Sequence, residues 1–175
     1  MRDPDRALEG QALLETLLEQ ERRLIFDRFD NDMAITLGLR ILERARAGCK
    51  AVVVDISRGD QRLFYAALAG TAADNEFWVA GKIAVVKRFG HSSFYIGERA
   101  RQRGVDFAAS ALVDPLVFRA HGGCFPIIMR DVGMVGTATV SGLPQAEDHA
   151  LVVAAIEDFL DEQAAGGDRR EVWTA

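Results

Sequence analysis

The segment around residue 121 brings together residue types that can bind or activate a ligand. His121, Gly122, Gly123, Cys124 and Phe125 are consecutive. Two glycines in a row allow positive φ and can turn backbone N–H groups toward an anion, and an imidazole beside a thiol can form a thiolate nucleophile. We therefore expect a ligand-binding loop here. Two alternatives stay open: the glycines end a helix while the cysteine fills the core, or the cysteine and histidine form a nucleophilic pair.

A second candidate begins at Ser141-Gly142-Leu143-Pro144, where a strand is expected to end and a helix to start. A helix N-terminus offers unpaired N–H groups and the positive end of the dipole to a carboxylate or phosphate. Ser141 either contacts such a ligand or caps the helix, and serine's preference for helix starts favours the cap. His149 shares the helical phase of the apolar residues after it. It is therefore expected beside the buried face, as a ligand contact or a hydrogen-bonded core residue.

Cationic side chains form a third group at the expected end of a helix. Lys87, Arg88 and His91 stand close in sequence, and Lys82 precedes them by a turn or so. Cations at a helix C-terminus are favourable because of the helix dipole alone. The alternative is that they bind the propionate or phosphate groups of a ligand.

Metal and cofactor motifs are absent from the sequence. It contains no HExxH, paired CxxC, P-loop, GxGxxG or CxxCH pattern. No metal site and no resident cofactor are therefore predicted, and haem is the alternative that the residues leave open. The candidate axial ligands for haem are His91, His121, His149, Met33, Met129 and Met134.

Hydrophobic periodicity predicts the elements that must position these side chains. Helices are expected over Ala7–Arg23, Asp30–Ala47, about 74–89, about 92–103, Leu116–Ala120 and Pro144 to about Gln163. Strands are expected over Ala51–Ser57, Gln61–Leu68, Phe125–Arg130 and Gly133–Val140, with a further short strand at Leu24–Phe26. Two hairpins separated by helices cannot make a purely parallel sheet. The pattern predicts an α+β fold, an antiparallel sheet flanked by helices.

Composition limits the class of protein. The chain has 175 residues and no internal linker, so we expect one domain over residues 1–163 and a frayed tail over 164–175. A net charge of -5 argues against a nucleic-acid partner. No apolar run approaches the ~20 residues that span a bilayer. Two cysteines and a charged N-terminal segment without an apolar run indicate a cytoplasmic protein.

Several stretches resemble a known family. They are FDNDMAITLG, GTAADNEFW, RFGHSS, HGGCFPI and GMVGTATVSGLPQAEDHALV. Together they resemble the GlcG/HbpS-like superfamily of "haem-degrading domain" proteins, and most closely its short bacterial and fungal branch, over roughly Phe26 to Leu160. HGGCFPI and VGTATVSGLPxxxDH at this separation are its specific part. The resemblance implies a profilin-like (GlcG-like) three-layer fold, a ring-like or higher homo-oligomer, and a haem or small-molecule role.

These observations predict a homo-oligomeric protein that binds a small, anionic molecule near the His121–Phe125 loop and the Ser141–His149 helix start. Alternatives are an enzyme of haem or related small-molecule metabolism, using His121 or His91, and an oligomeric protein–protein adaptor. The leucine stripe of Ala7–Arg23 or the Asp30–Ala47 helix, apolar over most of its girth, is expected to face another subunit. The two helices covering each other within one subunit is the competing account.

Overall fold

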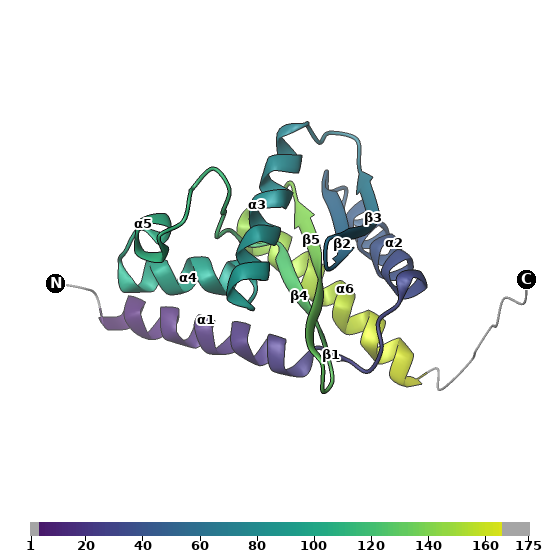
Figure 1. Cartoon of the computed structure of the whole chain (residues 1–175), viewed down its shortest axis with the longest axis horizontal. Coiled ribbons are helices and arrows are strands. Elements are labelled where there is room, and N and C mark those ends of the chain that lie inside the picture. The colour runs from purple at the N-terminus through teal and green to yellow at the C-terminus, as the bar shows by residue number, and fades with distance from the viewer. Residues whose placement is uncertain (1–3, 166–175) are drawn as a thin grey trace, which may run out of the picture.

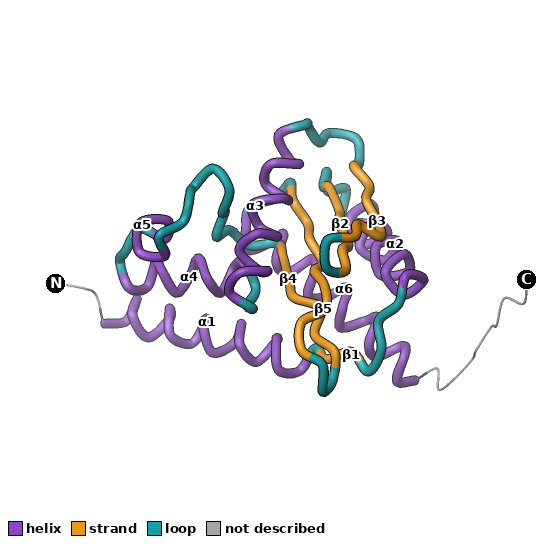
Figure 2. Tube along the Cα trace, in the orientation of Figure 1, coloured by secondary structure: helices purple, strands orange, loops and turns teal. Residues whose placement is uncertain are grey.

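The computed structural model describes residues 4–165, which form an α+β fold of six helices and five strands (Figures 1 and 2). The helices are α1 Pro4–Arg23, α2 Asn31–Ala47, α3 Asp74–Phe89, α4 Ser93–Arg103, α5 Phe107–Ala111 and α6 Gln145–Ala165. The strands are β1 Ile25–Phe26, β2 Val53–Arg58, β3 Gln61–Ala67, β4 Cys124–Met129 and β5 Gly133–Ser141.

The five strands form one sheet in the order β1-β4-β5-β2-β3. Both predicted hairpins are present: β2 pairs antiparallel with β3, and β4 pairs antiparallel with β5. The antiparallel pairing of β2 with β5 joins the hairpins, with Asp55 opposite Thr139. The predicted short strand is β1, but it pairs in parallel with β4. The sheet is therefore antiparallel except at this one short edge.

Helices cover both faces of the sheet. Helices α2 and α6 pack on one face and α3 packs on the other, while α1 and α4 lie together beyond β4 (Figure 1). Because side chains alternate along a strand, the two faces differ. The α2/α6 face carries the main apolar core, including Ile56, Phe125 and Val140. The α3 face buries the polar side chains of Asp55 and Thr139.

The apolar stripes of the first two helices are largely covered within the chain, but not by each other. Leu14 and Leu17 of α1 are buried, and α1 packs against α4. Helix α2 packs on the sheet and against its neighbour α6 at the same time, which explains why so much of its girth is apolar. The leucine stripe of α1 is thus largely buried within the subunit, while Ile35 and Leu39 of α2 remain exposed.

Two predicted elements differ from the structure. The segment predicted as a helix over Leu116–Ala120 is a turn followed by extended chain, while α5 was not predicted. The Asp-Pro pair favours a helix locally, but tertiary contacts hold this segment in another conformation. The Arg119 N–H donates to the Gly81 carbonyl of α3 at 3.0 Å. Helix α6 continues to Ala165, and the rest of the predicted tail lies outside the described residues. No helix in residues 4–165 is long and apolar enough to cross a membrane.

Candidate functional site

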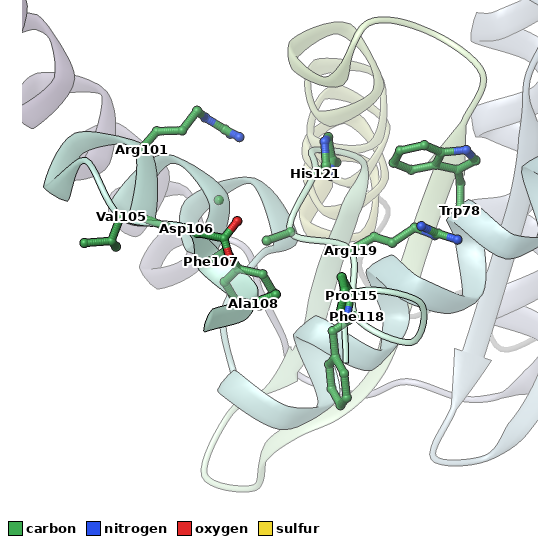
Figure 3. Close-up of a pocket in the computed structure, with 13 residues that line it drawn as sticks. Trp78, Arg101, Val105, Asp106, Phe107, Ala108, Pro115, Phe118, Arg119 and His121 are labelled. Carbon is green, nitrogen blue, oxygen red and sulfur yellow. The ribbon is translucent and has the colours of Figure 1, made fainter. Parts of the chain in front are cut away.

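An open pocket of about 310 Å³ lies between α4, α5 and the extended segment that leads to β4 (Figure 3). Its walls are mostly apolar. It is lined by Trp78, Gly97, Ala100, Arg101, Val105, Asp106, Phe107, Ala108, Pro115, Phe118, Arg119, Ala120 and His121. His121 is thus the one member of the predicted site that borders this pocket. Volumes of this order are typical of small-ligand sites.

His121 is held at the pocket as a neutral base. Its ring meets the indole of Trp78 edge to face, with the ring centroids 5.0 Å apart. Partial burial lowers its pKa, and the positive charges of Arg101, Lys82 and Arg119 lower it further. At pH 7 the imidazole is therefore uncharged, with one nitrogen as donor and the other as acceptor.

Two arginines make the pocket electropositive. The Arg119 guanidinium lies over the Trp78 ring, 4.9 Å from its centroid, and its Nε donates to the Phe77 carbonyl at 3.2 Å. No described carboxylate pairs with Arg119. Arg101 is shared between Glu98 and Gln145. Asp106, the one acid of the lining, accepts the Ala109 N–H and so caps α5.

The glycine pair serves close packing. Gly123 has φ +122°, and a Cβ there would stand 2.3 Å from the Val140 carbonyl oxygen. A Cβ on Gly122 would stand 2.0 Å from the carbonyl oxygen of Gln145 in α6. Residues 118–121, directly before this pair, are not helical, so the helix-cap alternative is wrong. Gly123 therefore has the positive φ that a glycine allows, whereas Gly122 does not.

Cys124 is a core residue and not an activated thiol. Its side chain is fully buried in β4, and this burial raises the pKa of the thiol to about 12. The hydroxyl of Thr139 donates to its sulfur at 3.1 Å. A thiol with this pKa holds almost no thiolate at neutral pH, so the Cys–His alternative has no support here. Phe125 is likewise buried and belongs to the apolar core.

The predicted anion site at the start of α6 is occupied by the protein's own Asp148. Its carboxylate accepts the backbone N–H groups of Gly142 and Leu143. The Nζ of Lys82 donates to the same carboxylate at 2.8 Å and to the Val140 carbonyl at 3.0 Å. Ser141 lies buried within β5, so the prediction that it caps this helix is wrong. Asp148, which sequence reasoning assigned only to the helix dipole, instead binds the two residues Gly142 and Leu143 that lead into the helix.

The Lys82–Asp148 pair is buried on both sides, each residue being 2% exposed. Burial lowers the pKa of Lys82, opposed by the Asp148 charge. Burial also raises the pKa of Asp148, opposed by Lys82 and the two N–H groups. The pair fixes α3, β5 and α6 around Gly123, whose missing side chain leaves room for Nζ. Lys82 therefore supports the pocket from beneath and does not line it.

The other predicted cations and histidines do not converge. Arg88 lies over Phe118 and donates to the Ala111 carbonyl. His91 lies against α1, where its Nδ1 is 2.6 Å from a Glu21 carboxylate oxygen. His149 is buried on α6, as its phase predicted, with Nε2 2.8 Å from Gln20 Oε1. Arg88, His91 and His149 thus lie outside the pocket lining.

Sequence reasoning missed Trp78, Arg101 and Arg119. Arg119 was missed because residues 116–120 were predicted as a helix, and a helix would not place this segment against α3. For Asp148 a signal did exist. Positions 148, 152, 155 and 159 share one side of α6, and all four are buried.

Known proteins share this fold and sequence pattern. The family model described as "Haem degrading protein HbpS-like" matches residues 29–157. The chain is 51% identical over 146 residues to the UPF0303 protein of Streptomyces coelicolor, covering 83% of this chain and 92% of that one. The solved structure of the Ybr137w protein has a TM-score of 0.80 at 30% identity, covering 93% and 98% of the two chains. The complex of PduOC with haem has a TM-score of 0.61 at 17% identity, covering 74% and 93%. The chain therefore belongs to the HbpS-like haem degrading protein family.

Proposed function

We propose that the protein binds a small organic anion in the pocket between α4, α5 and residues 115–121. The observation that carries this proposal is the environment of Arg119. Its guanidinium has no described acidic partner, faces an apolar pocket and is held in place by Trp78 and the Phe77 carbonyl. A carboxylate that reaches Arg119 gains a bidentate hydrogen bond in a partly desolvated setting. The apolar walls favour a ligand whose remaining atoms are hydrocarbon or aromatic.

His121 adds a polar contact that does not change the charge of the site. Because its pKa is lowered, the ring stays neutral near pH 7 and can donate or accept one hydrogen bond. Three other predicted residues act through packing: Gly122, Gly123 and Lys82, together with Asp148, fix the chain that presents His121. This arrangement supports binding, and no residue pair in the pocket forms a nucleophile with a base.

Haem fits this pocket only in part. Arg101 and Arg119 suit its propionates and His121 suits its iron, but the pocket of about 310 Å³ is at the lower end of small-molecule sites. A tetrapyrrole ring would project from it. We therefore expect added haem to give no sharp Soret shift at one haem per subunit. A stoichiometric shift abolished by His121→Ala would show that haem is the ligand instead.

A fluorescence titration with 2-naphthoate, an aromatic carboxylate, tests the proposal, because Trp78 lines the pocket. We expect saturable quenching, and about tenfold weaker binding in Arg119→Met, which keeps the aliphatic packing on Gly81. Arg99→Met is the matched control, since Arg99 stacks on Tyr95 and does not line the pocket. Equal affinity in Arg119→Met and the parent protein would refute the assignment.

The assembly and compartment belong to the same proposal. The protein is a homo-oligomer, supported by the apolar side chains of α2 that the fold leaves exposed. It works in the cytoplasm, supported by its two free thiols, Cys49 and Cys124. Native mass spectrometry of freshly purified protein reports the subunit number and any retained ligand together. A mass of one subunit at micromolar concentration would refute the oligomer while leaving the pocket to its own test.

A further inference from the structure

One side of α2 is exposed although it carries apolar residues. Ile35 is 43% exposed and Leu39 is 48% exposed, and Asp32 and Arg46 flank them on the same side. Asp32, Leu39 and Arg46 are spaced by seven residues, which is about two turns of helix. Neither Asp32 nor Arg46 has an ion-pair partner among the ion pairs found for residues 4–165. This side of α2 is referred to below as the Leu39 side.

The Leu39 side faces away from α6 and toward the free edge of the sheet. Arg44 marks the α6 side of the helix, because it pairs with Asp158 of α6. At about 100° per residue, Ile35 lies half a turn around the helix from Arg44. Helix α2 covers β2 and β3, and β3 is the last strand of the sheet. The Leu39 side therefore lies toward the outer edge of β3.

The β3 edge is protected over its first half only. A free strand edge exposes backbone donors and acceptors, and monomeric proteins block it with proline, charged side chains, bulges or short length. Strand β3 has seven residues without proline, and its one charged residue is Arg62 near its start. Its register shifts by one residue near Leu63, and Phe64 to Ala67 pair regularly with β2. The position of Gly38 against the Phe64 ring places the middle of α2 over the middle of β3.

The charges at the two ends of the Leu39 side are complementary to each other, and the exposed Glu43 lies between them. If a second copy of α2 packs antiparallel to the first, with Leu39 against its counterpart on a twofold axis, Asp32 of each copy faces Arg46 of the other. Both ion pairs then form at once, as an isologous interface requires. The same axis passes beside the centre of β3, because Leu39 neighbours Gly38 over Phe64. A single twofold axis thus pairs the charges of the Leu39 side and covers the β3 edges of both copies.

Helix spacing is compatible with this arrangement. Strands are about 4.8 Å apart, and α2 covers β2 and β3 together. Two β3 edges placed side by side about a twofold axis then put the α2 axes roughly 10 Å apart. That separation is within the range of about 8–10 Å for packed helices. We infer that the Leu39 side of α2 and the β3 edge form a twofold interface with a second copy of this chain.

Charge reversal tests the interface without disturbing the fold, since Asp32 and Arg46 are exposed. This inference rests on the homo-oligomer proposed above. Asp32→Arg and Arg46→Asp each place like charges at both ends of the contact, so each should raise the dissociation constant at least about tenfold by light scattering. The double variant Asp32→Arg/Arg46→Asp restores both pairs in exchanged form and should recover the parent assembly. Recovery by the double variant is a result that loss of folding cannot imitate.

A cross-link gives a second measurement. In a Cys49→Ser background, which leaves only the buried Cys124, Leu39→Cys should form a disulfide-linked dimer on mild oxidation. Leu116→Cys is the control, since Leu116 is 76% exposed but lies beside the pocket. A mass near 19.2 kDa for the parent protein would overturn the oligomer and this interface together. An oligomer that ignores both single reversals and gives no Leu39→Cys cross-link would overturn this interface alone.

Discussion

Gly122 and Gly123 occupy positions where a side chain of any size meets backbone. Gly123 has φ +122°, which other residues rarely adopt, and the nearest atoms to an added Cβ are carbonyl oxygens at both sites. Backbone cannot move aside as the end of a flexible side chain can, so strain and overpacking add. We expect valine at either position to cost at least about 2 kcal/mol.

For a chain of this length, that cost corresponds to a melting temperature lower by about 4–8 °C. Gly48→Ala is the matched control. Gly48 has an ordinary φ of -88°, and a Cβ there meets only normal contacts. Melting curves of Gly122→Val and Gly123→Val that coincide with the Gly48→Ala curve would contradict the close packing seen here.

His149 gives the protein a pH response with a calculable sign. Burial lowers its pKa from 6.5 to about 4. Above pH 6.5 the ring is neutral in both folded and unfolded states, so it adds no pH dependence. Between pH 6.5 and about 4 the unfolded chain binds the proton and the folded protein does not. The free energy of unfolding therefore falls with falling pH, by up to about 1.4 kcal/mol per pH unit from this group.

Denaturant unfolding at several pH values measures this slope. In His149→Gln the ionisable ring is absent, and an amide can still bond to Gln20. The slope of the unfolding free energy against pH between 6.5 and 4 should therefore fall by the amount that corresponds to about one proton. His91→Gln serves as the control because His91 is partly exposed and paired with Glu21. An identical slope in His149→Gln and the parent protein would show that the ring is not buried in its neutral form.

Single residues also show where sequence reasoning ends. The phase of His149 on α6 predicted its burial correctly, because apolar spacing defines the inner side of a helix. The same phase places Asp148 on that side, but its partner is 66 residues away in α3. A buried ion pair leaves no local pattern, since each half resembles a surface residue. The pairing of Lys82 with Asp148 could therefore be found only in the structure.

At the scale of elements, a buried carboxylate ties the C-terminal end of α1 to the body, in addition to the buried Leu14 and Leu17. Glu21 is 6% exposed, accepts the N–H of the fully buried Ser92 at 2.7 Å and contacts His91 Nδ1. Glu21→Ala leaves the Ser92 N–H without a partner, which should cost about 1–3 kcal/mol. Hydrogen exchange of α1 amides should accelerate in the same variant, because the end of the helix loses its attachment to the α3–α4 junction.

Glu19→Ala is the control for this prediction. Glu19 is two residues away on the same helix but exposed, and it pairs only with the exposed Arg22 at 3.4 Å. Exposed pairs of this kind contribute little to stability. If both alanine variants unfold at the same denaturant concentration, Glu21 does not anchor α1.

Elements with local signals were predictable, and those that depend on distant contacts were not. The hairpins β2–β3 and β4–β5 follow from turn residues between apolar runs, and the cap residue Asp30 marks the start of α2. The Asp114-Pro115 signal predicted a helix, but the segment 115–122 is instead held by α3 through the Arg119 N–H and by α6 through a bond from the Gly122 N–H to the Gln145 side chain. This stretch supplies five of the thirteen residues that line the pocket, among them Arg119 and His121. That is why sequence reasoning found His121 but not Arg119 beside it.

At the scale of the whole molecule, the pocket and the proposed subunit interface are far apart. The pocket lies at the α4–α5 end, while α2 and β3 lie at the opposite end, with the sheet between them (Figure 1). Coupling between sites requires an element with two arrangements that both sites bias. The sheet between them is fixed by two hairpins and by the buried Lys82–Asp148 pair, so no such element connects them.

We therefore expect 2-naphthoate to bind one molecule per subunit without cooperativity, and with the same affinity in Leu39→Glu, which places a charge at the proposed twofold axis. Isothermal titration calorimetry of both proteins measures stoichiometry and affinity, and light scattering on the same samples reports assembly. A Leu39→Glu protein that is dissociated yet binds normally would establish that each subunit carries a complete site. Affinity lost together with assembly would mean that a neighbouring subunit completes the pocket, because the fold of one subunit does not link these two ends.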